Sequence, residues 1–163
     1  MGDIYDLSRN IENCIEKHSF KRYKINNIYN FKNIIVWRRK TFTNTAILLI
    51  DLSDNRLNNI KNLGEFAQKI KFDLGKEIGY IYSIYALYLK IIFYGDNIIE
   101  LSNNLADYID KFDNQRVVLQ SIYIIDNYNK ENKSAKTWTH WLNAGSTDKC
   151  QNLIKKTIED FQT

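Results

Sequence analysis

Three apolar segments decide the fold of this chain: AILLIDL (Ala46–Leu52), ALYLKIIFY (Ala86–Tyr94) and VVLQSIYII (Val117–Ile125). Each is a nearly unbroken run of β-branched, aliphatic or aromatic residues, as expected of strands that are covered on both faces. The second segment carries a single charge, Lys90, and is the best candidate for the middle of a sheet. Because helical patterns separate the three segments, we expect a β-α-β-α-β core.

Two amphipathic helices are expected between these strands, because apolar residues recur there at steps of three or four. The first has Ser53 or Asp54 as its N-cap and Gly79 as its stop, and the second opens at Asp96 or Asn97. Their apolar stripes are Leu57, Ile60, Leu63, Ala67, Ile70, Leu74 and Ile78 for the first helix and Ile98, Leu101, Leu105, Ile109 and Phe112 for the second.

Further elements flank this core on both sides. Asp3 to Phe20 has the apolar spacing of a helix. Ile34 to Arg39 and Thr45 to Leu52 fit an antiparallel hairpin, whose turn is Lys40 to Asn44. A last helix is expected near the C-terminus, capped by Ser146 or Thr147 and with an inner stripe of Leu153, Ile154, Ile158 and Phe161.

Three polar stretches have weaker patterns. Lys21 to Asn33 fits either a short edge strand or an irregular connection, and Thr137 to Leu142 fits either an edge strand or a turn of helix. Asp126 to Lys136 lacks apolar periodicity, so we expect a loop there. The expected order of elements is α-β-β-α-β-α-β-(β)-α.

The expected fold is one α/β domain over residues 1–163, with a mixed sheet of four to five strands and helices packed on it. A largely antiparallel α+β sheet is the alternative, because apolar periodicity does not report strand direction. A hydrophobic content of 44% supplies enough material for a core and excludes a disordered chain.

The charge balance is mildly basic, with a net charge of +4 and a pI near 8.9. This balance permits contact with nucleic acid or an acidic protein. The chain also uses Ile, Asn, Lys and Tyr heavily and contains no Pro, a bias that adds lysines without any binding role.

A cytoplasmic location is expected. Cys14 and Cys150 are far apart and fit free thiols better than a zinc site or a redox pair. Met1 to Asn10 lacks the basic start and apolar block of a signal peptide. The most apolar stretch, Ile78 to Tyr94, contains a lysine and five tyrosines, so we expect no membrane insertion.

Acidic residues follow the three core strands: Asp51, Asp54, Asp96 and Asp126. If the strands run parallel, these carboxylates meet at one edge of the sheet, where they suit Mg²⁺ and metal-assisted phosphoryl chemistry. Each of Asp54, Asp96 and Asp126 also suits a helix N-cap or a turn, and this structural interpretation is favoured.

Two other clusters are candidate binding surfaces. The hairpin carries Trp37, Arg38, Arg39, Lys40 and Phe42, which combine cations with aromatic faces. A solvated hairpin tip with Trp37 turned inward is the favoured alternative, because exposed charge at a turn is ordinary. The second cluster is Trp138, His140 and Trp141, beside Lys136, and it fits equally an interface or the closure of the core.

Catalytic motifs are scarce. The six glycines form no phosphate-binding loop, and His18 beside Cys14 is best explained by helix packing. The first functional hypothesis is therefore a non-enzymatic protein that binds a macromolecular partner, most simply another protein, without a metal or cofactor. The second is a Mg²⁺-dependent phosphoesterase or nuclease that uses the four aspartates, and the third is a nucleic-acid-binding protein.

Overall fold

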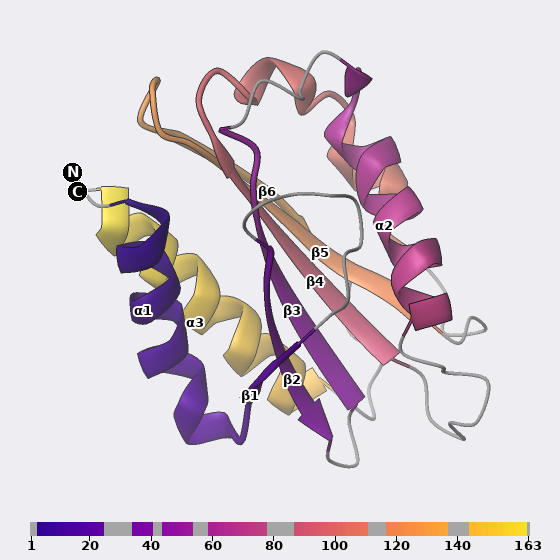
Figure 1. The fold of residues 1–163 in the computed structure, drawn as a ribbon, viewed down its shortest axis with the longest axis vertical. Helices are drawn as coiled ribbons and strands as arrows, with labels where there is room; N and C mark the ends of the chain where they lie inside the picture. Colours follow the sequence, from indigo (N-terminus) through magenta and orange to yellow (C-terminus); the bar gives the residue numbers. More distant parts are fainter. Residues whose placement is uncertain are drawn as a thin grey trace.

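The computed structural model describes residues 3–24, 34–40, 44–53, 59–77, 87–110, 117–136 and 144–162. Within these ranges three α-helices and six strands form a mixed α/β body, which confirms the expected fold class (Figure 1). The sheet has six strands, more than the four to five expected, because both edges carry a strand of polar sequence.

The strands lie in the sheet in the same order as in the chain. Their bounds are β1 Lys21–Tyr23, β2 Ile34–Lys40, β3 Asn44–Asp51, β4 Leu87–Gly95, β5 Val117–Asp126 and β6 Glu131–Lys136. β3, β4 and β5 are parallel neighbours, whereas β1–β2, β2–β3 and β5–β6 pair antiparallel. The parallel β-α-β core is therefore confirmed, and so is the hairpin of β2 and β3.

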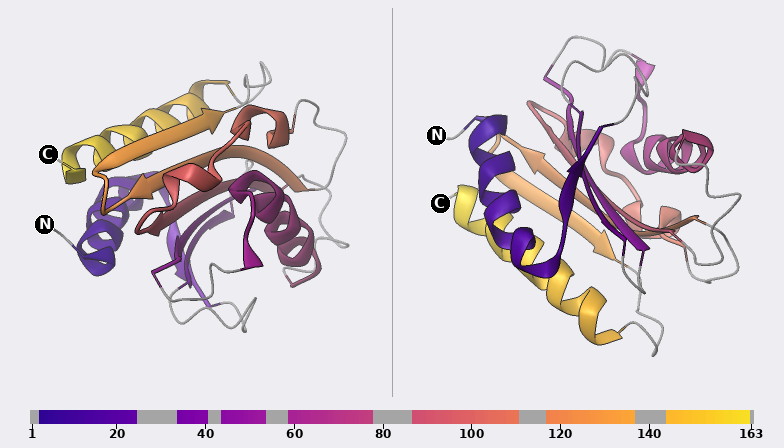
Figure 2. Two further views of the ribbon diagram at one scale, coloured as in Figure 1. Left: turned by 90° about the horizontal axis from the view of Figure 1, so that it is seen from above. Right: turned by 60° about the horizontal axis from the view of Figure 1, so that its bottom comes forward.

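Helical layers cover both faces of the sheet (Figure 2). On one face, α2 (Leu63–Glu77) and the segment after β4 pack on Leu48, Ile91 and Ile124 of the three central strands. On the other face, α1 (Ile4–Ile15) and α3 (Ala144–Gln162) pack on Ile47, Ile92 and Ile125. Alternate residues of each central strand thus enter two separate cores, which explains why the strands are apolar throughout.

The first helix begins as predicted, since Asp3 caps α1 by accepting hydrogen bonds from the backbone N–H groups of Tyr5 and Asp6. Its predicted end at Phe20 is wrong: α1 ends at Ile15, and a 3-10 helix, η1 (Glu16–His18), leads to Ser19, which has a left-handed backbone (φ 65°).

The start predicted for α2 is wrong: the helix begins at Leu63, after Ile60, and its cap is Asn62. Asn62 Oδ1 accepts from the N–H groups of Gly64 (2.7 Å) and Glu65 (3.2 Å). The Asn62 side chain satisfies the first backbone N–H groups of the helix, so the helix starts after Asn62 although the apolar spacing begins earlier in the sequence.

The start predicted for the last helix is also wrong. α3 begins at Ala144, so Ser146 and Thr147 lie inside it and do not cap it. Its inner face does carry the expected Ile154 and Ile158, which are buried against the sheet.

The long helix predicted to open at Asp96 or Asn97 is wrong. The segment forms two short 3-10 helices, η4 (Ile99–Leu101) and η5 (Leu105–Tyr108). Asn97 and Asn104 have left-handed backbone conformations, with φ of 55° and 54°, which an α-helix does not tolerate. The apolar stripe is nevertheless used, since Ile98, Leu105 and Ile109 enter the core beneath α2.

The loop predicted for Asp126 to Lys136 is wrong in its second half, where β6 pairs with β5. β6 lacks an apolar pattern because it lies at the sheet edge, with every side chain exposed except the half-buried Ala135. The stretch Lys21 to Asn33 begins with β1, and its residues 25–33 lie outside the described residues. Thr137 to Leu142 also lies outside them.

Among the described residues, no helix is long and apolar enough to cross a bilayer.

Candidate functional site

The carboxyl ends of the parallel strands place two of the predicted aspartates at one edge of the sheet. Asp51 ends β3, where it pairs with Tyr94, and Asp96 follows β4. Burial, and then the charges of Asp96, Asp51 and Asp3, raise the pKa of Tyr94. Asp54 lies outside the described residues.

Asp126 stabilises the turns at this edge of the sheet through hydrogen bonds. Its carboxylate is buried and accepts hydrogen bonds from the backbone N–H groups of Asn97, Ile99 and Asn129 and from the Asn129 side chain, at 3.0–3.2 Å. Burial alone would raise the pKa of Asp126, but these four donors outweigh it and lower that pKa. Asp126 therefore joins the ends of β4 and β5, with its oxygens already engaged.

No group of three His, Cys, Asp or Glu side chains suited to a metal ion occurs in the described part of the chain. With Asp126 engaged by four donors, the structure offers the magnesium hypothesis little support.

In the predicted hairpin cluster, Trp37 and Arg39 are buried and Arg38 is half-buried. Trp37 is 1% exposed, and the buried Arg39 guanidinium lies 4.9 Å from the ring centre of Phe20. Arg38 is half-buried, 5.4 Å from the Tyr23 ring, and donates a 3.3 Å hydrogen bond to Asn44 Oδ1. The aromatic contacts of both arginines are thus internal.

Of the remaining residues in the two predicted clusters, only Lys40 lies within the described residues. Lys40 is the last residue of β2, and Phe42 lies outside the described residues. Trp138, His140 and Trp141 also lie outside them.

A β-bulge in β5 creates a buried polar cluster that sequence reasoning missed. Leu89 pairs with Leu119 and Lys90 pairs with Ser121, so Gln120 is the extra residue. A bulge of this kind turns two successive side chains toward one face. Accordingly, Lys90 Nζ reaches Gln120 Oε1 at 2.6 Å, and Lys90, Gln120 and Ser121 are all buried.

This cluster extends to α3. Tyr123 donates a 3.4 Å hydrogen bond to the backbone oxygen of Gln151, whose buried side-chain amide has no hydrogen-bond partner among the described residues. Burial raises the pKa of Tyr123 and that of the neighbouring Cys150 thiol, although the charges of Lys90 and Arg39 oppose the second shift. Both groups are therefore protonated at neutral pH.

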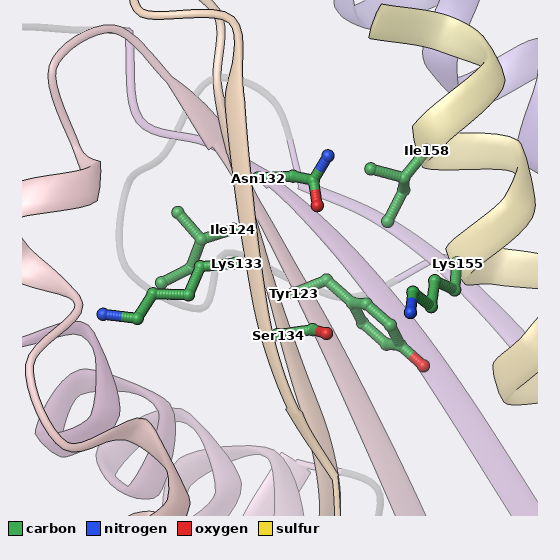
Figure 3. Close-up of a pocket in the computed structure, with 7 residues that line it drawn as sticks. All are labelled: Tyr123, Ile124, Asn132, Lys133, Ser134, Lys155 and Ile158. Atoms are coloured by element: carbon green, nitrogen blue, oxygen red, sulfur yellow. The ribbon is translucent and has the colours of Figure 1, made fainter.

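An open crevice reaches Tyr123 from the sheet edge (Figure 3). Asn132 and Ser134 of β6 form one side of it, and Lys155 and Ile158 reach toward it from α3. Ile124 and Lys133 also contribute to its lining, but their side chains point to the opposite face of the sheet. The crevice is shallow and encloses about 10 Å³.

The surface around this crevice is basic. Between residues 130 and 156 the described ranges carry six exposed lysines and two acids, Glu131 and Asp148. The lysines are Lys130, Lys133, Lys136, Lys149, Lys155 and Lys156. Glu159, one turn further along α3, forms an exposed 3.7 Å ion pair with Lys155. We call β6, the crevice and these lysines the basic edge.

Two sequence signals pointed toward these features. Lys90 stood alone as a charge in an apolar strand, which marks a buried polar contact. Lys133 and Lys136 frame a short polar run, and lysine is common on exposed edge strands. Neither signal indicates a ligand by itself.

Comparisons with protein-family models, with curated proteins and with solved structures found no match.

Proposed function

We propose that this protein is a binding domain that takes up an extended, acidic segment of a partner protein along β6. The observation that carries the proposal is the basic edge. Within the described residues β6 pairs with β5 alone, so its outer side presents backbone donors and acceptors to another strand. Addition of a peptide strand to an exposed sheet edge is a common mode of protein recognition.

The charges of the edge favour an acidic occupant. Lys136 is exposed on β6, and Lys155 lies across the crevice on α3. Lys133 points to the opposite face of the sheet (Figure 3), where its Nζ donates a 3.0 Å hydrogen bond to the Ser102 backbone oxygen. Like charges on facing strands repel, so a second lysine-bearing strand pairs poorly here, whereas Asp or Glu side chains pair well. The two edges of the sheet also differ, because β1 is only three residues long.

A cytoplasmic setting suits this role. Cys14 and Cys150 are both free thiols, as is usual in a reducing compartment.

The test is to select binding sequences from a displayed library of short random peptides and to measure the affinity of the synthetic peptides. Selected peptides should be rich in Asp and Glu and poor in Pro. Lys136→Glu should weaken binding by about tenfold or more, because it reverses a charge on β6. Lys17→Glu, also at an exposed position, in the 3-10 turn that follows α1, serves as the matched control and should change affinity by less than about twofold.

Nucleic acid is the competing partner. If a single-stranded oligonucleotide binds the basic edge more tightly than every selected peptide, and its affinity falls steeply with salt, the protein-partner proposal is wrong.

A further inference from the structure

We infer that the mouth of the crevice between β6 and α3 receives the carboxylate of one acidic side chain of the bound segment. This inference rests on the proposed function and specifies its chemistry. The geometry follows from strand addition, because side chains of an added strand alternate between the two faces of the sheet. Those on the α3 side lie beside Asn132 and Ser134, at the mouth of the crevice.

The crevice is too small for a whole small molecule. Its enclosed volume is about 10 Å³, room for about one water molecule, whereas sites for whole small molecules enclose roughly 300–1,000 Å³. A free metabolite is therefore a poor occupant. A carboxylate delivered by a peptide backbone held on β6 instead lies at the mouth of the crevice, between Ser134 and Lys155.

The lining offers groups that suit a carboxylate. Lys155 brings an ammonium group from α3, and Ser134 brings a hydroxyl donor from β6. The ammonium group of Lys155 already lies 3.7 Å from a carboxylate oxygen of Glu159. That pair is exposed and therefore weak, so an incoming carboxylate competes with it easily.

The floor of the crevice is fixed. Tyr123 is 4% exposed, and its hydroxyl is held by the Gln151 backbone oxygen. Asn132 is held by Gln162. An acidic side chain thus meets a prearranged site and causes little reorganisation, which lowers the entropy cost of binding.

A double-mutant cycle tests the inference with the selected acidic peptide as the probe. Each Glu or Asp of the peptide is replaced in turn by Gln or Asn, and each peptide is titrated against the wild type, Lys155→Gln and Lys156→Gln. Lys156 is the matched control, because it is the next residue on α3 and is exposed but does not line the crevice.

We expect one acidic position of the peptide to couple with Lys155. Removing that acid should weaken binding to the wild type and to Lys156→Gln by about fivefold to tenfold, but should have little effect on binding to Lys155→Gln. If every peptide position gives the same ratio with Lys155→Gln as with the wild type, the inference is wrong although the peptide binds. If no peptide binds β6, the proposed function fails and the inference fails with it.

Discussion

Asn132 and Gln162 join the sheet edge to the end of the last helix. Asn132 Nδ2 donates a 2.5 Å hydrogen bond to Gln162 Oε1, and Gln162 Nε2 donates a 3.0 Å hydrogen bond to the backbone oxygen of Glu131. One side chain of α3 therefore holds the first two residues of β6. This pair of hydrogen bonds fixes the distance between β6 and α3, and with it the width of the crevice.

Replacement of Gln162 by Ala should loosen β6 without unfolding the protein. Both bonds are exposed, so the loss of unfolding free energy should be about 1 kcal/mol or less. Hydrogen exchange of the Glu131 and Asn132 amides should become faster, while exchange in β4 stays unchanged. Lys156→Ala is the control on the same helix, and equal exchange in both variants would show that Gln162 does not hold the edge.

Asp126→Asn should destabilise the protein by about 2–3 kcal/mol at neutral pH, measured by urea unfolding. The amide keeps one acceptor oxygen but turns an NH₂ group toward backbone N–H donors, and it removes the charge that strengthens all four hydrogen bonds. Asp107→Asn, at an exposed position on η5, is the control and should change stability by less than about 0.5 kcal/mol.

The pH dependence of this effect has a definite sign. The folded-state pKa of Asp126 is lower than its ordinary value of 3.8, so its ionised carboxylate adds stability above that value. The contribution disappears as the pH falls through the lowered pKa of the folded state. The gap between wild type and Asp126→Asn should therefore be constant above pH 3.8 and narrow below it, and a gap independent of pH would refute this assignment.

Gly64→Ala should destabilise the protein although Ala favours helices. A Cβ atom at this position would overlap the ring of Tyr108, which packs against the start of α2. The overpacking costs about 1–3 kcal/mol, more than the roughly 1 kcal/mol that Ala gains in helix propensity. In a Tyr108→Ala background the same substitution should be neutral or stabilising, and thermal unfolding of the four proteins tests this reversal.

Cys150 should react slowly with a thiol reagent in the folded protein. It is 3% exposed, and burial raises the pKa of its thiol, so little thiolate is present at neutral pH. Cys14 is half-buried and should be labelled first. Mass spectrometry of the labelled peptides measures both rates, and equal rates before unfolding would contradict the burial of Cys150.

The sequence predicted the parallel core well, because Leu89, Ile91, Ile92 and Phe93 are divided between two cores, so β4 is apolar on both faces apart from Lys90. The prediction was wrong where a single polar residue determines where a helix starts or breaks. Asn97 and Asn104 break a helix that the apolar stripe favoured, and Asn62 caps α2 later than expected. β6 was missed because an exposed edge strand has no apolar periodicity.

The candidate site was harder to predict than the fold. The hairpin cations looked exposed in sequence, yet Arg39 stacks on Phe20, a residue nineteen positions earlier. The crevice combines β5, β6 and α3, and no local pattern brings Tyr123, Asn132 and Lys155 together. Asp51 and Asp96 lie at the same edge of the sheet, as the parallel strands require, whereas both oxygens of Asp126 accept hydrogen bonds from the turn that follows it.

The most direct test of strand addition is amide hydrogen exchange along β6, measured by NMR with and without a saturating selected peptide. Strand addition predicts that those amides of Glu131–Lys136 that do not bond to β5 are protected by about tenfold or more in the complex. Protection confined to other surfaces, with the exchange of β6 unchanged, would contradict the proposal that this edge is the binding site.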